Sequence, residues 1–201
     1  EDDEMVHYNY SRAQERGLWE WWNMHRIHTN ISEDVSFRRV ITLAQRMDAA
    51  IYFVHVSAKE GVNAIGEARA LGLPVYGETL HNYACFDAGR YREPDGTKYH
   101  TYPSLKYEDD CRELWAGLLD ERLSVVATDL VSTSFEFKTR YKTVADVTGG
   151  HNGIETRMGI AYTEGVVGRG MSLERFVDIT SANPAKIFGC YPQKGAIAAG
   201  S

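Results

Sequence analysis

The sequence predicts an α/β fold. Short apolar runs typical of strands alternate with amphipathic stretches typical of helices, and no low-complexity linker or internal repeat interrupts the alternation. Two of the apolar runs end in a residue that can bind a metal ion, His55 and Asp129. The 201 residues, 43% of them hydrophobic and 25% charged, suffice for one sizeable core. We therefore expect one domain, or a large part of one.

The first amphipathic stretch predicts a helix that begins after Ser32 and continues to about Met47. Ser32 is a good N-cap, and acidic residues follow it in the first turn. Its apolar residues recur at helical spacing, so this helix is expected to bury one face; they are Phe37, Val40, Ile41, Ala44 and Met47. The run Ile51-Tyr52-Phe53-Val54 is too short for a helix and predicts a buried strand with His55 at its end.

The next elements repeat this order. Residues 59–71 predict a helix stopped by Gly72, and residues 74–79 form a second, weaker strand candidate. A polar stretch over residues 87–106 is long for a simple connection, and its role is open. A helix with Leu114, Trp115, Leu118 and Leu119 follows, and residues 123–128 predict a third buried strand that ends in Asp129.

The C-terminal part predicts two further helices. Ser172 opens the first, and Pro184 suits the first turn of a second, short helix that is capped by Asn183 or Ser181 and closes near Gly189. Residues 194–201 look like the approach to a strand that is not reached, and the first residue is not Met. We therefore expect the sequence to begin and end inside a longer protein.

Charge and cysteine content narrow the function classes. A formal net charge of −6 leaves no excess of Lys and Arg for a nucleic acid or an anionic membrane, so a small-molecule or protein partner is favoured. No apolar run approaches the ~18–20 residues of a membrane span. The three cysteines, without CxxC spacing, indicate neither a disulfide framework nor a zinc ribbon. The composition favours a cytoplasmic protein.

His55 and Asp129 are the candidate chemical groups. In a parallel α/β barrel the reactive side chains collect at the carboxyl ends of the strands, where both residues are expected. An imidazole and a carboxylate suit zinc, and Asp129 could also act as the general base that carries a proton to a leaving nitrogen. These two residues alone leave a structural histidine and a capping aspartate as open alternatives.

Several segments resemble the dihydropyrimidinase and D-hydantoinase family, in the order the family has them. They are residues 52–57 (YFVHVS), 75–79 (VYGET), 126–129 (VATD), 175–186 (RFVDITSANPAK) and 191–195 (YPQKG). The resemblance implies the C-terminal half of a (β/α)₈ barrel of the TIM type, truncated at both ends, with residues 1–201 forming about strands 5 to 8. It also implies a homotetramer, and hydrolysis of a cyclic amide C–N bond to give an N-carbamoyl amino acid.

The resemblance further implies two zinc ions, with His55 and Asp129 among their ligands. The family's HxH pair, bridging lysine and other single histidine would precede Glu1. Glu1-Asp2 matches the end of the motif that holds that histidine, and His7 is the alternative ligand. With so few ligands, this chain alone is expected to be inactive.

The substrate residues depart from the family's pattern. Tyr102 stands where the family has a substrate-binding serine, and Gly149 stands where it has an asparagine. Leu130 replaces the histidine that commonly follows the aspartate, which indicates a divergent branch whose substrate can differ. A non-catalytic dihydropyrimidinase-related scaffold and an allantoinase-like hydrolase of cyclic ureides are the alternatives.

Other polar residues are given structural roles. His25 and His28 lie in a tryptophan-rich segment expected to pack, and His81 and His100 are expected in loops, facing solvent or hydrogen-bonded. Glu78, at the end of the second strand, is a candidate for supporting the site. The charged clusters Glu1–Glu4 and Glu108–Arg112 are expected to be solvated.

Overall fold

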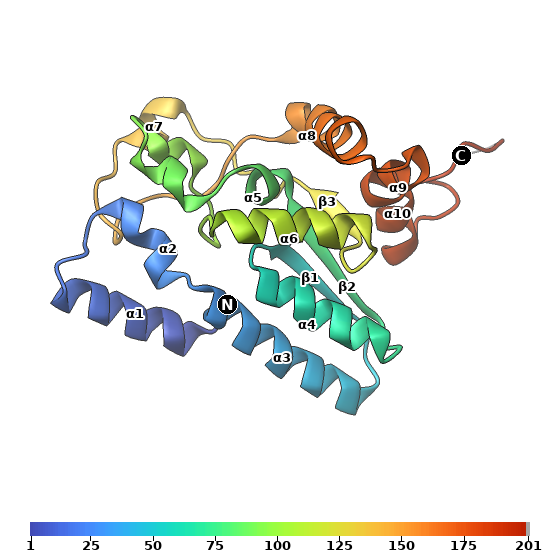
Figure 1. Cartoon of the computed structure of the whole chain (residues 1–201), viewed down its shortest axis with the longest axis horizontal. Helices are drawn as coiled ribbons and strands as arrows, with labels where there is room; N and C mark the ends of the chain where they lie inside the picture. Colours follow the sequence, from blue (N-terminus) through green and yellow to red (C-terminus); the bar gives the residue numbers. More distant parts are fainter. Residues whose placement is uncertain (200–201) are drawn as a thin grey trace.

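The computed structural model describes residues 1–199 and is built on a three-stranded parallel sheet (Figure 1). The strands are β1 (Ile51–Val56), β2 (Val75–Leu80) and β3 (Val125–Ala127), in the order β1-β2-β3. Val56 pairs with Thr79, which in turn pairs with Val126, so the three strands end close to one level. The predicted α/β class and its three strands are confirmed, and the weakest candidate proves to be the central strand.

Short helices account for most of the remaining chain. The α-helices are α1 (Asp3–Glu15), α2 (Met24–Ile27), α3 (Asn30–Met47), α4 (Lys59–Ala70), α5 (His81–Cys85), α6 (Glu108–Leu119), α7 (Phe135–Thr139), α8 (Ile154–Ile160), α9 (Leu173–Val177) and α10 (Asn183–Ile187). Three 3₁₀ segments, η1 (Trp21–Asn23), η2 (Ala88–Arg92) and η3 (Gly96–Tyr99), and two π-helical segments, η4 (Ala161–Val167) and η5 (Asp178–Ala182), complete the set. The sequence did not predict α1 or the helix over residues 154–167.

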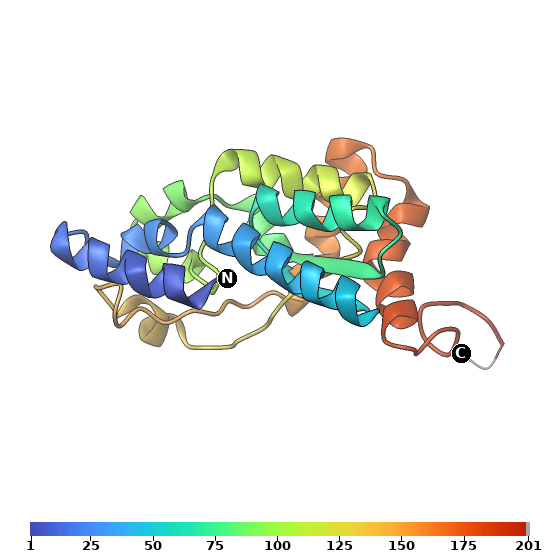
Figure 2. The same cartoon turned by 90° about the horizontal axis from the view of Figure 1, so that it is seen from below.

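One face of the sheet is covered and the other is open. Helices α3, α4 and α6 lie side by side over one face (Figures 1 and 2), where fully buried residues such as Val62, Ile65 and Leu114 form the core. This contact is close, because a Cβ at Gly77 would lie 2.6 Å from Cδ1 of Ile65. On the opposite face Val54 is 47% exposed, whereas Tyr52 packs against Phe188 with 5.0 Å between the ring centroids. Around Val54 this face therefore presents apolar surface that residues 1–199 leave uncovered.

Helix α3 begins earlier than predicted. Its cap is Thr29, whose side chain accepts from the Ser32 amide, while Ser32 is fully buried and exchanges hydrogen bonds with the Asp2 backbone. The apolar stripe is also only partly buried: Phe37 is in the core, but Met47 is 77% exposed. Helical spacing located the helix correctly and misjudged how much of it has a neighbour to pack against.

The last two predicted helices form one continuous helical segment over residues 173–187. Ser172 caps it as predicted, by accepting from the Arg175 amide. The expected break and second cap are wrong, because residues 178–182 continue as a π-helical segment and Asn183 itself has right-handed helical backbone. Gly189, with φ of 72°, follows the end of the helix, as expected.

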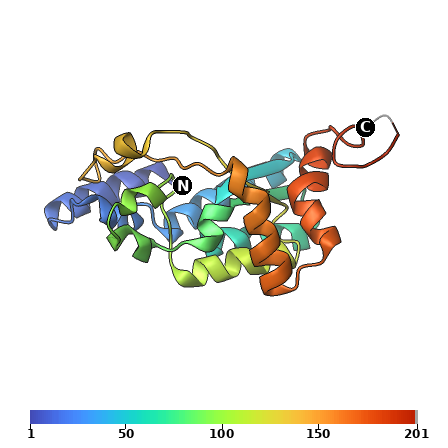
Figure 3. The ribbon, with the colours of Figure 1, turned by 90° about the horizontal axis from the view of Figure 1, so that it is seen from above.

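The segment between β3 and α8 runs along the molecule to α1 and returns (Figure 3). Its far end is held by backbone bonds, from the Trp21 amide to Lys142 O and from the Val144 amide to Trp19 O. It returns beside β3, where Leu130 and His151 form a parallel bridge. This path brings residues 130–153 back to the end of the sheet. Nowhere in residues 1–199 is there a helix both long and apolar enough to span a bilayer.

Candidate active site at the carboxyl edge of the sheet

The carboxyl ends of the three strands bring polar residues to one edge of the sheet. His55 is the penultimate residue of β1, His81 directly follows β2, and Asp129 follows β3 by two residues. Because the strands are parallel, all three residues lie at the same edge, which is where α/β proteins carry their reactive groups. The structure thus brings His55 and Asp129 to one edge, as predicted.

His55 has an unusual backbone for a strand residue. Its φ is 43°, in the left-handed region, and the register of β1 against β2 shifts between Phe53 and Val56. A non-glycine residue in this region costs of order 1 kcal/mol, and such residues cluster at functional sites. The imidazole is half-buried and forms no hydrogen bond with any residue of the described chain. The ring nitrogens are therefore free to bind a ligand.

Asp129 repeats these features on β3. Its φ is also 43°, its side chain is exposed, and within residues 1–199 its carboxylate has no hydrogen bond or ion pair. The carboxylate charge acts on the neighbouring His151 ring. A carboxylate held at a strand end without a partner can bind a cation or accept a proton.

The donor types fit zinc, but the described chain does not complete a site. Imidazole nitrogen and carboxylate oxygen are both zinc ligands. No group of three or more His, Cys, Asp or Glu side chains within residues 1–199 is arranged to hold an ion. His7, the alternative third ligand, is exposed on α1 and pairs with Asp3 at 3.5 Å. Two ligands are the most that this part of the chain offers.

A second pair of imidazoles, His81 and His151, lies at the same edge. Their ring centroids are 5.6 Å apart in an edge-to-face arrangement, and Thr156 Oγ1 lies 3.4 Å from His81 Nε2. Burial and the charge of His81 lower the pKa of His151 to about 4, and burial also lowers the pKa of His81. Both rings are therefore neutral at pH 7. Neither nitrogen of His151 has a partner among residues 1–199.

The sequence analysis missed this pair. His81 was expected in a loop, facing solvent or hydrogen-bonded. It is hydrogen-bonded, with Nδ1 3.5 Å from Ala127 O, but it is buried at the first position of α5 rather than in a loop. His81, like His55, is a histidine at a strand end and could have been selected for the same reason. His151 was not considered, because nothing local marks the segment that carries it as one that returns to β3.

Tyr102 and Gly149, the two predicted substrate residues, are in contact. A Cβ at Gly149 would lie 2.3 Å from Cδ2 of Tyr102, and the Tyr102 hydroxyl donates to Val147 O at 3.1 Å. The rings of His100 and His28 flank Tyr102 at 4.8 and 5.2 Å. Only glycine allows this approach of the two segments.

Two cavities differ in their relation to this edge. One of about 370 Å³ is lined by Leu130, which directly follows Asp129 in the chain, and by Ser132 and residues 152–156. A larger one of about 630 Å³ lies between α5, α6 and η4. Neither lining includes His55 or Asp129, and of the two only the smaller contains a residue adjacent to Asp129, Leu130. The smaller cavity is therefore the better candidate for part of a substrate site.

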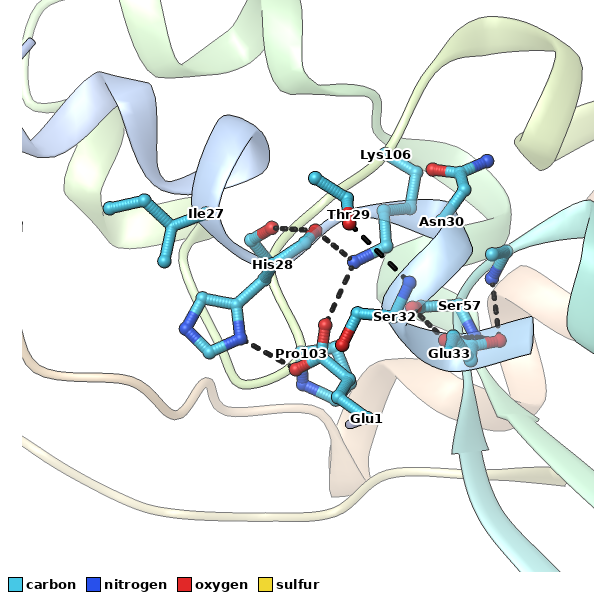
Figure 4. Close-up of polar contacts among 12 residues, drawn as sticks. Glu1, Ile27, His28, Thr29, Asn30, Ser32, Glu33, Ser57, Pro103 and Lys106 are labelled. Carbon is cyan, nitrogen blue, oxygen red and sulfur yellow. Dashed lines mark hydrogen bonds and ion pairs between the residues drawn. The ribbon is translucent and has the colours of Figure 1, made fainter. Parts of the chain in front are cut away.

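A buried polar cluster, consisting of Glu1, His28, Glu33 and Lys106, lies around the N-terminal end of α3 (Figure 4). Lys106 Nζ donates to His28 O at 2.5 Å and lies 3.4 Å from Glu1, whose other oxygen is 2.6 Å from His28 Nδ1. Burial raises the pKa of Glu1, but the Lys106 charge and the His28 bond outweigh it and lower the pKa to about 2. The prediction of a solvated Glu1–Glu4 cluster is therefore wrong for Glu1 and for the buried Asp2.

The remaining polar residues have structural contacts. Asp110 is buried and accepts from the amides of Tyr107 and Lys59, so the Glu108–Arg112 cluster is not uniformly solvated either. His100 is fully buried beside Tyr91, with 3.1 Å between its Nδ1 and the tyrosine hydroxyl. Glu78 accepts from the Tyr52 hydroxyl at 2.5 Å.

Known proteins match the chain over most of its length. No protein-family model matches the sequence. A D-phenylhydantoinase of Escherichia coli O1:K1 is 37% identical over 172 residues, which are 84% of this chain. The crystal structure of dihydropyrimidinase from Brevibacillus agri covers 97% of the chain with a TM-score of 0.92 and 34% identity. The D-hydantoinase of a Bacillus species, 33% identical over 98% of the chain, gives the same TM-score.

The chain belongs to the dihydropyrimidinase/hydantoinase family. The L-hydantoinase of Arthrobacter aurescens, at 25% identity and a TM-score of 0.90, has the same fold. The chain spans 37% of the length of the E. coli relative and 43% of the B. agri protein. The family is therefore established for a segment less than half as long as its relatives.

Proposed function

We propose that this chain is part of a zinc-dependent amidohydrolase that opens a dihydropyrimidine or hydantoin ring to an N-carbamoyl amino acid. One observation carries the proposal: the imidazole of His55 and the carboxylate of Asp129 have no hydrogen-bond partner among residues 1–199, and both lie in left-handed backbone at one edge of a parallel sheet. Relatives named hydantoinase and dihydropyrimidinase support the reaction class.

The fold part of the proposal is a half-barrel. We propose that residues 1–201 form about strands 5 to 8 of a (β/α)₈ barrel. Support comes from three parallel strands separated by helices, from the open sheet face with exposed Val54, and from the 43% coverage of the B. agri structure. The rest of the barrel would cover that face and supply the missing ligands. This chain alone would then be inactive.

The two ligands have separate tasks. His55 would hold zinc through a ring nitrogen and Asp129 through a carboxylate oxygen. Zinc, when bound, supplies Lewis acidity toward water and the ring carbonyl. Hydrolysis breaks the ring C–N bond, adds a hydroxyl to the carbonyl carbon and leaves a proton for the nitrogen. Asp129 would take that proton on its carboxylate and release it to the leaving nitrogen.

The segments that carry Tyr102 and Gly149 would bind the substrate through their backbone. The Tyr102 hydroxyl already donates its proton to Val147 O, so it has no proton left to donate to a substrate. Gly149 lacks a side chain and can present only its amide and carbonyl groups. A substrate with amide donors and acceptors on its ring edge suits such contacts.

The setting of the enzyme is also proposed. We place it in the cytoplasm as a homotetramer with a small cyclic amide or ureide as substrate, without nucleic-acid or membrane partners. The three cysteines are free thiols, which suits a reducing compartment.

Metal analysis and a substrate panel test the proposal in the full-length protein. We expect about two zinc ions per subunit and opening of dihydrouracil or hydantoin that a chelator abolishes. Preference for allantoin would move the enzyme to the cyclic-ureide hydrolases. A metal-free protein that opens none of the three rings would instead be a non-catalytic scaffold related to dihydropyrimidinase.

A further inference from the structure

Lys138 is a buried cation without a carboxylate partner. It lies on α7, its relative exposure is 4%, and no Asp or Glu oxygen of residues 1–199 lies within ion-pair distance of its Nζ. Lysine is almost never fully buried unless it is paired, because desolvating an ammonium is costly. A lysine in this position therefore requires an explanation in its contacts.

The Lys138 ammonium joins two segments that are distant in sequence. Nζ donates to His100 O at 2.5 Å and to Thr148 O at 2.6 Å. His100 lies two residues before Tyr102, and Thr148 directly precedes Gly149. The cation thus bridges the backbones of the two segments that carry the proposed substrate residues.

Two further contacts join the same segments. The Tyr102 hydroxyl donates to Val147 O at 3.1 Å, and the Tyr102 ring packs against Cα of Gly149. The Tyr102 side of this link is 38% exposed, whereas Lys138 is only 4% exposed. With the ammonium removed, the buried His100 carbonyl and the partly buried Thr148 carbonyl would both lose this donor.

The position of Lys138 relative to the sheet edge links it to the site. Its charge acts on His100 and on His151, and the His151 ring also senses Asp129. Burial lowers the pKa of Lys138 to about 8, so the ammonium is largely present at pH 7. Lys142, four residues later, shows the ordinary alternative: it is exposed, with Nζ 3.5 Å from Thr139 O.

We propose that Lys138 is a positioning residue that clamps the segments around Tyr102 and Gly149 into the geometry that binds the ring of a cyclic amide. The inference rests on the proposed function for the identity of the ligand, but the clamp itself is a property of the described chain. Lys138 does not touch the substrate. It acts through the two carbonyls that it holds.

Lys138→Met in the full-length protein tests the clamp, because methionine keeps the buried length and removes the charge and all donors. We expect KM for hydantoin or dihydrouracil to rise about tenfold or more, while kcat changes far less and the zinc content is unchanged. Amide hydrogen exchange in peptides covering residues 99–106 and 145–152 should accelerate about tenfold. Lys138→Arg, which retains the charge and the donors, should restore part of both effects.

Lys142→Met is the matched control, since it removes a lysine of the same segment without a bridging role, and it should leave exchange and KM unchanged. If amide hydrogen exchange in both segments of Lys138→Met stays at the wild-type rate, the proposal that Lys138 holds them is overturned. An increase spread evenly over the chain overturns it too, because Lys138 would then serve general stability. If the Met variant does not fold, Lys138→Gln gives the same readouts. A protein that opens no cyclic amide refutes the proposed function, and hydrogen exchange still decides the clamp.

Discussion

Two groups of polar residues in this chain are built in opposite ways. In the buried polar cluster, Lys106 bonds to His28 O and Glu1, and Glu33 accepts from the amides of Ser57 and Ala58 and from the Ser57 hydroxyl. At the carboxyl edge of the sheet, His55 and Asp129 have no such partners in the described chain and sit in left-handed backbone. The charged groups of the first group are paired by the fold, and of its polar atoms only His28 Nε2 lacks a partner among residues 1–199, whereas neither side chain of the second group is paired.

The difference indicates which group serves stability and which serves function. A buried charge destabilises the fold unless its partners are present, so a satisfied cluster is explained by folding alone. An unpaired imidazole or carboxylate on a strained backbone forms no stabilising contact within the described chain. Binding of a ligand explains such an arrangement. Substitutions at the sheet edge should therefore lower activity and leave stability nearly unchanged, whereas substitutions in the buried polar cluster should change stability and leave activity nearly unchanged.

The largest effect is expected at Asp129. Asp129→Asn removes the proposed proton carrier and weakens the proposed zinc ligand, so kcat/KM of the full-length protein should fall by about 10²–10⁴-fold. The midpoint of chemical denaturation of the metal-free protein should stay nearly unchanged, because the exposed carboxylate has no partner to lose within residues 1–199. Steady-state kinetics and denaturation of one preparation measure both quantities.

Asp95→Asn is the matched control for Asp129→Asn. Asp95 is likewise exposed, has a positive φ of 55°, and lies before η3 rather than at a strand end. Its variant should keep wild-type kinetics. Equal losses in the two variants would mean that the strand-end position has no special role.

The residues at the strand ends could be predicted from the sequence, whereas the buried polar cluster could not. Strand ends are local features, so His55 and Asp129 could be selected from apolar runs alone, and the family motifs strengthened that choice. The burial of Glu1, Lys106 and Lys138 depends on contacts 27 to 105 residues away in sequence, which no local pattern contains. The same reason explains why the predictions of a solvated Glu1–Glu4 cluster and of a fully packed face on α3 were wrong.

Glu33 should show the opposite behaviour to Asp129, with a change in stability and none in chemistry. Burial raises the pKa of Glu33 to about 7, against the favourable effects of Lys106 and of the bonds from Ser57 and Ala58. Between pH 4.5 and 7 the folded state then binds a proton that the unfolded state has released. The contribution of this group to the free energy of unfolding therefore falls as pH rises through that window, by roughly 1–3 kcal/mol.

Glu33→Gln cannot titrate and should lack this pH-dependent loss, which denaturation at pH 5 and pH 8 would measure. Glu67→Gln is the control, because Glu67 is exposed and its pKa is lowered by Arg38, so its variant should keep the wild-type slope above pH 5. The kinetics of Glu33→Gln at pH 7 should remain close to wild type. A large loss of kcat in this variant would erase the distinction between the two groups.

The smallest expected effects are the stability changes caused by alanine at two glycines, Gly149 and Gly159. Gly149→Ala places a Cβ 2.3 Å from the Tyr102 ring, so the ring must move and the variant should lose about 1–3 kcal/mol of stability along with substrate affinity. Gly159→Ala, in α8 with no atom within 4 Å of its Cβ, should instead gain roughly 0.5–1 kcal/mol from helix propensity. Denaturation and KM measured on both variants test this. Because Gly149 lies in neither polar group, a rise in KM there without a loss of zinc would place substrate binding in the segments that Lys138 holds, beside the strand ends that carry the proposed metal ligands.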